Sequence, residues 1–552
     1  MSRFPSSRTS LPLFALTFLF STWATGQEDH KLIASDGAEE DFFGSSVAVW
    51  GDIAVIGAFQ DDDNGLDSGA AYVFEVSTGE QLAKLLPSDG SFDDEFGWSV
   101  GVHDEIAIIG APDDVSDDAI SGSAYLFDVT TGAQLAKLLP SDGEEGDSFG
   151  RSVAICNDFA IVGAFAADDN GTDSGSAYIF DLATGAQLAK LLPSDGSSFD
   201  YFGIAVAISG DRAIVGASYA DDNGPASGAA YVFDVMSGIQ IAKLLPSDGE
   251  MQDFFGQAVA IHGGDAIVGA FRDDDNGFES GSAYLFDVNT GTERAKLLAS
   301  YGAADDYFGW SVGINDGIAI VGAPYNDSQG MGSGAAYLFD VATGAQTSML
   351  LPSDSANYDT FGWSVAICDD DALVGAKFDD DNGSGSGSAY LFLGSDLGPG
   401  SSFCFGDDSQ AACPCGNIGG EGEGCANGLG NGALLTGSGS ASLSDDDLVL
   451  TTSQLTPGSG LYFQGNNAVN GGDGNPFGDG LRCAGGSVRR IEVTFANTGN
   501  DLTTSTSVSI ATQGDVSVGQ TRHYQYWYRD SLGSPCSSGF NLSNAYEVTW
   551  TL

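Results

Sequence analysis

Residues 43–59 read FGSSVAVWGDIAVIGAF, and the chain returns to this stretch six more times. The opening Phe-Gly pair recurs every 53 residues, at Phe43, Phe96, Phe149, Phe202, Phe255, Phe308 and Phe361. The Gly-Ala pair that begins at Gly57 keeps the same spacing, and so does Tyr72. A spacing this strict indicates seven structural units, each of which meets its neighbours in the same way.

Within one unit the apolar residues alternate with period two, as in β-strands. The segments 45–50, 52–58, 70–76 and 81–87 are rich in Val, Ile, Tyr and Phe and are separated by turn residues such as Asp63-Asn64-Gly65. Four strands in about 50 residues are typical of a propeller blade. We therefore predict an all-β fold that contains a seven-bladed β-propeller of four-stranded blades.

The two ends of the repeat region predict how the propeller closes. The segment HKLIASDG, residues 30–37, matches the fourth strand of every later unit, whereas the chain after Tyr390 lacks a fourth strand of its own. We expect the N-terminal strand Lys31 to Ser35 to complete the last blade, which leaves no exposed edge at the ends of the array. The propeller then spans residues 27–393, and we expect it to be a monomer.

The first 26 residues have the features of a signal peptide. Arg3 and Arg8 precede the apolar run LPLFALTFLF, and Ala24-Thr25-Gly26 fits a small-residue cleavage site. The apolar run is too short to cross a bilayer, and no later segment is long enough. We expect a mature protein that begins near Gln27 and is secreted, or located at the cell surface or in the periplasm, without a membrane span.

The C-terminal part of the chain has a different composition. A Gly/Ser/Pro linker at residues 394–402 leads to a predicted domain at 403–552, with strands expected at 448–455, 460–465, 489–496, 506–513 and 546–552. This domain holds six of the eight cysteines, Cys404, Cys413, Cys415, Cys425, Cys483 and Cys536. In an exported protein they favour disulfides over zinc, with 15 possible connectivities. We predict a small, disulfide-rich β-sandwich or jelly roll.

The repeats resemble FG-GAP repeats, the units of the integrin alpha-subunit propeller, and in particular their short bacterial variety. The phrases FG, IGAP at 109–112, VGAP at 321–324 and GAAYVF at 69–74 carry this resemblance. Integrin-type repeats often have a DxDxDG calcium loop between the first two strands, but here that joint is a tight turn such as Trp50-Gly51-Asp52. The family calcium position therefore does not transfer. Residues 403–552 resemble a C-terminal module of exported planctomycete proteins, through FCFGD, CPCGN, GCANG, FGDGLRCAGG, RHYQYWYRD and NLSNAYEVTW.

Acidic residues concentrate in two other loops, which leave the blades on one face. One links the second and third strands, as in DDDNGLDSG at 61–69, and the other carries an Asp before each Phe-Gly. Clustered carboxylates suit calcium, although Asp and Asn-Gly are also common turn residues. The candidate calcium ligands are Asp61, Asp63, Asp67, Asp169, Asp173, Asp273, Asp275, Glu279, Asp379 and Asp381. No other cofactor is expected.

Three further patterns have a structural and a functional interpretation. Lys84 and its counterparts in the fourth strands suit guards of an outer strand edge. His103, His262, Cys156 and Cys368 share one position at the end of the first strand, where isolated side chains are favoured over a zinc site. The aromatic residues of 522–530 could stack on a sugar, but their alternation favours a core.

The net charge of −59 excludes nucleic acid as a partner and favours cations or basic surfaces. The sequence contains four histidines and no recognisable catalytic constellation, so we expect a protein that is not an enzyme. We predict an exported binding, adhesion or scaffold protein that presents an acidic, calcium-binding propeller face to an extracellular protein, glycan or surface. The alternative is a glycan-binding lectin or a polysaccharide-degrading enzyme.

Overall fold

The computed structural model describes residues 25–26, 28–116, 119–369 and 371–393 of the repeat region. In the C-terminal part it describes residues 400–403, 413–414, 417, 425–427, 429, 432–438, 448–453, 455–469, 475–477, 479–496, 504–517, 520–530, 535, 538 and 540–550. Most of the predicted signal peptide and linker, and Cys404, Cys415 and Cys536, lie outside the described residues. No helix among the described residues is long and apolar enough to cross a membrane.

The seven repeats form seven sheets, here called blades 1 to 7, each with four strands of the repeat unit. The predicted strands of the first repeat are confirmed: blade 1 consists of β3 (Ser46–Trp50), β4 (Ile53–Ala58), β5 (Ala70–Glu75) and β6 (Gln81–Leu85), paired antiparallel in chain order. Blade 2 contains β7 (Ser99–His103), β8 (Ile106–Ala111), β11 (Ser123–Asp128) and β12 (Ala133–Leu138). Blade 3 contains β13 (Phe149–Cys156), β14 (Phe159–Ala164), β15 (Ser176–Asp181) and β16 (Gln187–Leu191). Blade 4 contains β17 (Val206–Ser209), β18 (Arg212–Ala217), β19 (Ala229–Asp234) and β20 (Gln240–Leu244).

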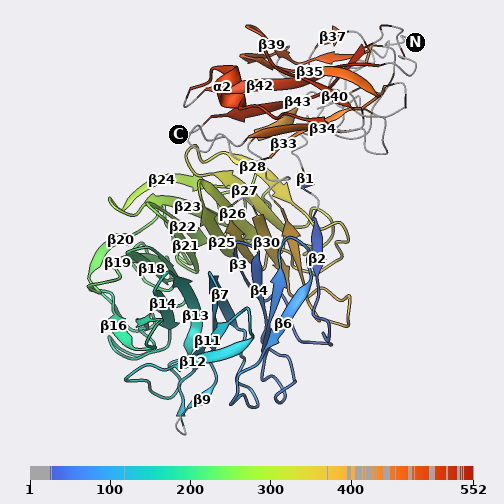
Figure 1. Cartoon of the computed structure of the whole chain (residues 1–552). Coiled ribbons are helices and arrows are strands. Elements are labelled where there is room, and N and C mark those ends of the chain that lie inside the picture. Colours follow the sequence, from blue (N-terminus) through green and yellow to red (C-terminus); the bar gives the residue numbers. More distant parts are fainter. Residues whose placement is uncertain are drawn as a thin grey trace, which may run out of the picture.

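Blades 5 to 7 repeat this order. Blade 5 contains β21 (Ala258–His262), β22 (Asp265–Ala270), β23 (Ser282–Asp287) and β24 (Thr292–Leu297). Blade 6 contains β25 (Ser311–Asn315), β26 (Ile318–Ala323), β27 (Ala335–Asp340) and β28 (Gln346–Leu350). Blade 7 contains β29 (Ser364–Cys368), β30 (Asp371–Ala376), β31 (Ser388–Phe392) and β2 (His30–Leu32). Two short additions lie outside this scheme: β1 (Thr25–Gly26) pairs with β28, and β9 (Val115–Ser116) pairs with β10 (Ala119–Ile120). Figure 1 shows the blades following one another in chain order.

The N-terminal strand β2 is the fourth strand of blade 7, as its sequence predicts. Lys31 pairs with Tyr390 and Leu32 pairs with Ala389 of β31. Phe43 bridges Gly387 in the way that Phe96 bridges Gly69 and the other Phe-Gly phenylalanines bridge the preceding blade. The first strands of neighbouring blades are in contact, and β29 of blade 7 also contacts β3 of blade 1.

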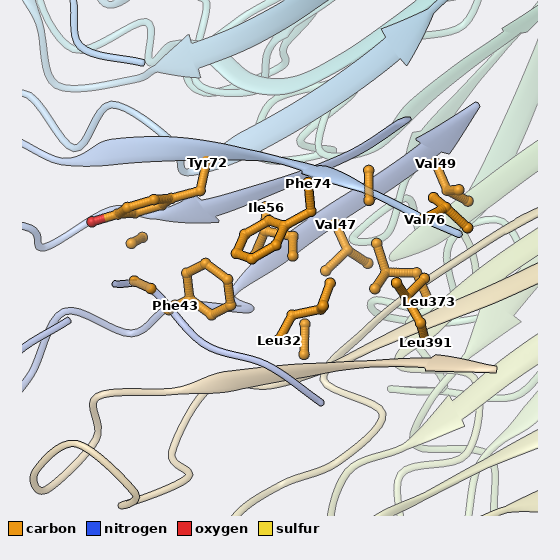
Figure 2. Packing of buried hydrophobic residues seen from close by; sticks show 14 of the residues in the cluster. Leu32, Phe43, Val47, Val49, Ile56, Tyr72, Phe74, Val76, Leu373 and Leu391 are labelled. Carbon is orange, nitrogen blue, oxygen red and sulfur yellow. The ribbon is translucent and has the colours of Figure 1, made fainter. Parts of the chain in front are cut away.

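The Phe-Gly phenylalanine packs between blades. Phe43 is fully buried, with its ring centre 5.4 Å from Tyr72 and 5.8 Å from Phe74. Leu373 and Leu391 of blade 7 belong to the same apolar cluster, so residues from both ends of the repeat region share one core (Figure 2). The aromatic residues at the positions of Phe43, Tyr72 and Phe74 are buried in every repeat, so they form the core between blades throughout the repeat region.

The glycines of the repeat are required by close backbone contacts between blades. A Cβ atom on Gly57 would lie 2.0 Å from the carbonyl oxygen of Gly97 in the next blade. Gly97 itself has a φ of +95°, and a Cβ atom there would lie 2.2 Å from the carbonyl oxygen of Ala70. Since a side chain fits at neither position, the Phe-Gly and Gly-Ala pairs set the separation of neighbouring blades.

The C-terminal part also consists of β-sheets. The larger sheet has the order β32 (Gly400–Phe403), β43 (Phe540–Thr549), β42 (Thr521–Arg529), β35 (Gly458–Gly465), β40 (Arg489–Ala496), and the smaller one has β33 (Leu434–Ser438), β34 (Val449–Ser453), β41 (Thr504–Ser505). Two hairpins accompany them: β36 (Asn467–Ala468) with β39 (Ala484–Gly485), and β37 (Asn475–Phe477) with β38 (Gly480–Arg482). Leucines of the smaller sheet and tyrosines of the larger one share one apolar core, which includes Tyr524, Tyr526 and Tyr528. The prediction that the aromatic residues of 522–530 alternate into a core is confirmed for these tyrosines.

One strand prediction in this part is wrong. Residues 506–513 do not form a strand, because the helix α2 (Ile510–Gly514) begins within them. Ser509 caps this helix by accepting a hydrogen bond from the backbone of Thr512, and Ile510 is buried in the shared core. A serine cap followed by one apolar anchor therefore outweighs the β-propensity of the segment.

The three cysteines in the described C-terminal part are in disulfides. Cys413 is bonded to Cys425, and Cys483 is also disulfide-bonded. In the repeat region Cys156 and Cys368 are free thiols.

Candidate functional site

The loops between the second and third strands place most of the predicted calcium ligands around lysine side chains. In blade 1, Nζ of Lys84 lies 2.8 Å from Asp61, 2.6 Å from Asp63 and 3.0 Å from Asp36. Tyr72 donates a hydrogen bond of 2.8 Å from its hydroxyl to Asp61, and its ring lies 5.2 Å from the same Nζ. Asp36 follows β2 of blade 7, so this lysine cluster links two neighbouring blades.

The lysine cluster recurs at six of the seven blade junctions. Besides Lys84, the clusters contain Lys31 with Asp354, Asp379 and Asp381; Lys137 with Asp89 and Asp114; Lys190 with Asp142 and Asp169; Lys243 with Asp195 and Asp222; and Lys296 with Asp248, Asp273 and Asp275. These ion pairs, rather than protection of a strand edge, explain why lysine recurs in the fourth strand.

The seventh junction lacks all three charges of the cluster. Met349 stands at the lysine position, and Tyr301 stands where the other six repeats have an aspartate. Asn326 stands where four of the other six repeats have an aspartate and repeats 3 and 4 have Ala167 and Ala220. Asn326 instead donates a hydrogen bond of 2.8 Å to Asp306. Repeats 3 and 4 keep the lysine and pair it with Asp169 and Asp222 instead. The ammonium is therefore absent at the junction where every lysine-contacting aspartate is replaced, by Tyr301, Asn326 and Ser328.

The charges of each cluster stabilise one another. Burial alone would lower the pKa of Lys84, but its hydrogen bonds to Asp61, Asp63 and Asp36 raise that pKa above its ordinary value. Burial would raise the pKa of Asp36, but the Lys84 ammonium and the Tyr72 hydroxyl hold it below the ordinary value. Both groups are therefore charged at neutral pH, and each stabilises the charge of the other.

The lysine contacts occupy most of the carboxylates that the sequence predicts as calcium ligands. Seven of the ten predicted ligands contact a lysine Nζ: Asp61, Asp63, Asp169, Asp273, Asp275, Asp379 and Asp381. Calcium coordinates oxygens at about 2.3–2.6 Å, so it would have to displace the ammonium from each cluster. Within the described part of the chain, no group of three or more His, Cys, Asp or Glu side chains is arranged to hold a metal ion.

The other three predicted ligands lie outside the lysine clusters. Glu279 accepts a hydrogen bond of 2.9 Å from Tyr307 and lies 3.5 Å from Arg272. The backbone of Asp173 donates a hydrogen bond of 2.8 Å to Asp168. The pKa of Asp67 is raised by burial and then by the negative charges of Asp62, Asp93 and Glu40.

The aspartates that precede each Phe-Gly are buried rather than displayed on the face. Asp41 is 5% exposed and accepts a hydrogen bond of 2.6 Å from the backbone of Ala38. Each counterpart accepts the same bond from the residue three positions earlier. Burial raises the pKa of Asp41 and of Asp359 to about 6. These residues therefore staple the loop between blades, and they add less negative charge to the face than the sequence suggests.

The histidines and cysteines at the ends of the first strands have separate surroundings. The ring of His103 lies 3.9 Å from that of Trp50, and Nε2 of His262 lies 3.0 Å from Asp316. Cys368 is buried and Cys156 is half-buried. Each side chain thus has contacts of its own.

The structure also shows a feature that the sequence interpretation missed, an aromatic belt. It follows the edge of the blades where each first strand begins and each second strand ends, beside the acidic loops. Consecutive ring centres lie 4.7–6.0 Å apart, except between Trp98 and Phe165, where Arg151 lies against both rings. The belt consists of Phe42, Phe59, Trp98, Phe165, Tyr201, Tyr219, Phe254, Phe271, Trp310, Trp363 and Phe378.

Three cationic side chains lie on the aromatic belt. Arg151 joins two of its members, with the guanidinium 4.1 Å from the Trp98 ring and 5.6 Å from the Phe165 ring. Nζ of Lys377 lies 3.6 Å from the Trp363 ring. Arg272 lies over Phe254 and Phe271.

A signal for the belt exists in the sequence. Its residues flank the constant Phe-Gly and Gly-Ala pairs, but they differ from repeat to repeat: the position after Phe-Gly holds Ser45, Trp98, Arg151, Ile204, Gln257, Trp310 and Trp363. Variation directly beside invariant structural residues marks positions released from the blade core, which a ligand surface requires.

A comparison with protein families identifies the repeats. The model described as FG-GAP repeat matches seven times, at residues 27–74, 80–127, 133–180, 186–233, 239–286, 292–339 and 345–392. The chain belongs to the FG-GAP repeat family. The matched segments cover more than half of the chain, and together with the four-stranded sheets they support an FG-GAP β-propeller. A search of curated proteins finds no match.

Proposed function

We propose that this FG-GAP protein is an exported, non-enzymatic binding protein whose ligand surface is the face formed by the aromatic belt and the acidic loops. The observation that carries this proposal is the belt itself. Aromatic rings from every blade lie along this edge of the blades, at positions where the seven repeats differ. Most of them are half-buried, whereas Phe59, Phe254 and Phe271 are buried and Tyr219 is exposed. Rings of this kind supply large contact areas at low cost in conformational entropy, as in many binding surfaces.

The proposal includes a closed ring of seven blades. It is supported by the pairing of β2 with β31, by the bridge between Phe43 and Gly387, and by the salt bridge of Lys31 with Asp354. An aromatic contact also joins the two ends of the repeat region, because Phe378 of blade 7 lies 5.3 Å from Phe42 of blade 1. Closure fixes the relative positions of residues from all blades, which a shared ligand surface needs.

The test of the binding function is a screen of the full mature chain against arrayed extracellular glycans and proteins. The double variant W310A/W363A removes two adjacent rings of the belt, whose centres lie 4.8 Å apart. We expect a ligand that the wild type binds and the variant does not. Retained binding in the variant would place the ligand surface elsewhere.

A glycan is the ligand class that the belt favours, since aromatic rings stack on the apolar faces of sugars. Release of reducing ends from a bound polysaccharide would show that the protein is an enzyme, which contradicts the non-enzymatic proposal. Binding without release identifies a lectin. Binding to proteins alone supports adhesion, and the domain at 403–552 is then a further candidate for the binding surface. We propose that this domain is the module of exported planctomycete proteins.

For calcium, lysine is already the cation in six blade junctions, so we propose Asp67 and its acidic neighbours as the remaining candidate site. A divalent ion there would relieve the repulsion that raises the pKa of Asp67. Thermal unfolding in calcium and in chelator tests this idea: a higher Tm in calcium is expected, abolished by D67N. An unchanged Tm would refute calcium binding.

Export is proposed from the N-terminal sequence. Mass spectrometry of the secreted chain should give an N-terminus near Gln27, and intact Met1 would contradict cleavage. Cleavage at this point removes β1 and leaves β2 in place.

A further inference from the structure

We propose that the aromatic belt binds a sugar unit with a single anionic group, a uronate carboxylate or a sulfate, and that Lys377 and Arg151 hold this anion. The inference rests on the proposed function of the loop face and names its ligand class. It follows from the surroundings of the two cations, which differ from those of the lysines in the blade clusters.

Lys377 is surrounded by aromatic rings instead of carboxylates. Its Nζ lies 3.6 Å from the centre of the Trp363 ring, 4.7 Å from Phe378 and 5.4 Å from Phe42. Among the residues that the structure describes, it takes part in no salt bridge. In a chain with a net charge of −59, where Lys31, Lys84 and Lys296 each contact three aspartates, an ammonium left without a carboxylate is the exception.

Arg151 lies on the same stretch of the belt. Phe59 lies 5.8 Å from Nζ of Lys377 and 4.7 Å from Trp98, whose ring lies 4.1 Å from the Arg151 guanidinium. Arg151 feels the charges of Glu95 and Asp113, whereas the electrostatic influence on Lys377 is that of Arg151 itself. Burial and this repulsion lower the pKa of Lys377 to about 8. A bound anion would remove the repulsion and compensate both cations.

The surroundings also limit the ligand. The acidic loops beside the belt repel a polyanion, so a nucleic acid or a densely acidic peptide is disfavoured. We assign the anionic group to the two cations, and the ring that carries it to the neighbouring Trp363 and Trp310, whose ring centres lie 4.8 Å apart. A sugar with one carboxylate or sulfate satisfies both conditions, because its apolar face stacks on aromatic rings while its anion meets the ammonium.

The test is isothermal titration of the full mature chain with four probes: an oligogalactan that ends in galacturonate, the same chain that ends in a sulfated galactose, the neutral chain, and a short peptide with one glutamate. We expect binding of an acidic sugar roughly 10–100-fold tighter than of the neutral chain, the range for a hydrogen bond to a charged group. The two acidic probes distinguish carboxylate from sulfate.

Variants connect the binding to the two cations. K377M should lose this preference, K377R should keep most of it, and R151Q should weaken it. R212A is the matched control, since Arg212 is also a cation but lies at the opposite edge of its blade, beside Asp211 and Asp234. An unchanged Tm for each variant separates binding from folding.

Three results would overturn the proposal. Equal affinity for neutral and acidic sugars would refute anion recognition while retaining glycan binding, and tighter binding of the peptide would refute the ligand class. Absence of binding to all four probes would refute the inference, whereas the proposed function would fail only if the array screen also found no ligand that depends on the belt.

Discussion

Replacing Lys296 by methionine, the residue that repeat 6 has at this position, should destabilise the protein far more than the loss of a surface charge. Nζ of Lys296 lies 2.9 Å from Asp248, 2.8 Å from Asp273 and 2.7 Å from Asp275. The side chains of Asp248 and Asp275 are about half exposed, so each pair contributes only about 0.2–1 kcal/mol. Asp273 is 6% exposed, and leaving its charge unpaired costs about 3–5 kcal/mol.

The chain supplies its own rescue. Repeat 6 combines Met349 with Asn326 and Tyr301. The variant K296M/D273N/D248Y copies all three residues, and K296M/D273N copies the first two. We expect K296M to lower the Tm by roughly 3–6 °C, and the added D273N to restore most of this loss. Thermal unfolding followed by circular dichroism measures each step. If D273N alone were harmless and gave no rescue of K296M, the lysine and the aspartate would not act as one unit.

Two further predictions concern the blade contacts and pH. G97A should be clearly less stable than G210A in thermal unfolding. Both glycines have positive φ, but an added Cβ at Gly97 would lie 2.2 Å from a carbonyl oxygen, whereas at Gly210 it meets nothing within 4 Å. Equal losses of Tm in the two variants would show that backbone strain alone matters. The pKa of about 6 for Asp41 and Asp359 lies above that of the unfolded chain, so the native state holds protons that the unfolded state has lost. Their contribution is present at low pH and is lost as pH rises through about 6, so the Tm should fall between pH 5 and pH 7.5, and D41N should weaken this dependence; a Tm that rises over this range would contradict the assignment.

Binding of the acidic sugar should show a pH dependence of its own. Lys377 faces Phe42, Phe59, Trp363 and Phe378 and the charge of Arg151, and its pKa of about 8 means that it loses its charge above that pH. The affinity for the acidic probe should decrease from pH 7 to pH 9 in the wild type and remain constant in K377R. A constant affinity in the wild type would remove Lys377 from the site.

The strands of the repeats could be predicted from the sequence because one register, copied seven times, averages out local ambiguity. The recurrence of Phe43, Gly57 and Tyr72 in every repeat indicates that they have structural roles. The pairing of β2 with β31 follows from the matching segment at residues 30–37. Recurrence says nothing about which side chains meet across blades. The contact of Lys84 with Asp36 joins residues 48 positions apart, and only the fold shows that the acidic loops surround lysine.

The aromatic belt escaped the sequence interpretation for a related reason. Its members occupy several positions of the repeat, and none of these positions is aromatic in all seven repeats. Comparison of the repeats at any single position therefore does not identify the belt. The helix α2 in place of a predicted strand shows the limit of propensity in a segment that has no repeat to support it.

The most direct test of the loop face as the ligand surface is hydrogen exchange followed by mass spectrometry, on the mature chain with and without its tightest-binding sugar probe. We predict that the ligand slows exchange in peptides that contain residues 42–45, 95–98, 148–151 and 359–378, which carry the aromatic belt with Arg151 and Lys377. Protection confined to residues 403–552, with the belt peptides unchanged, would contradict the account.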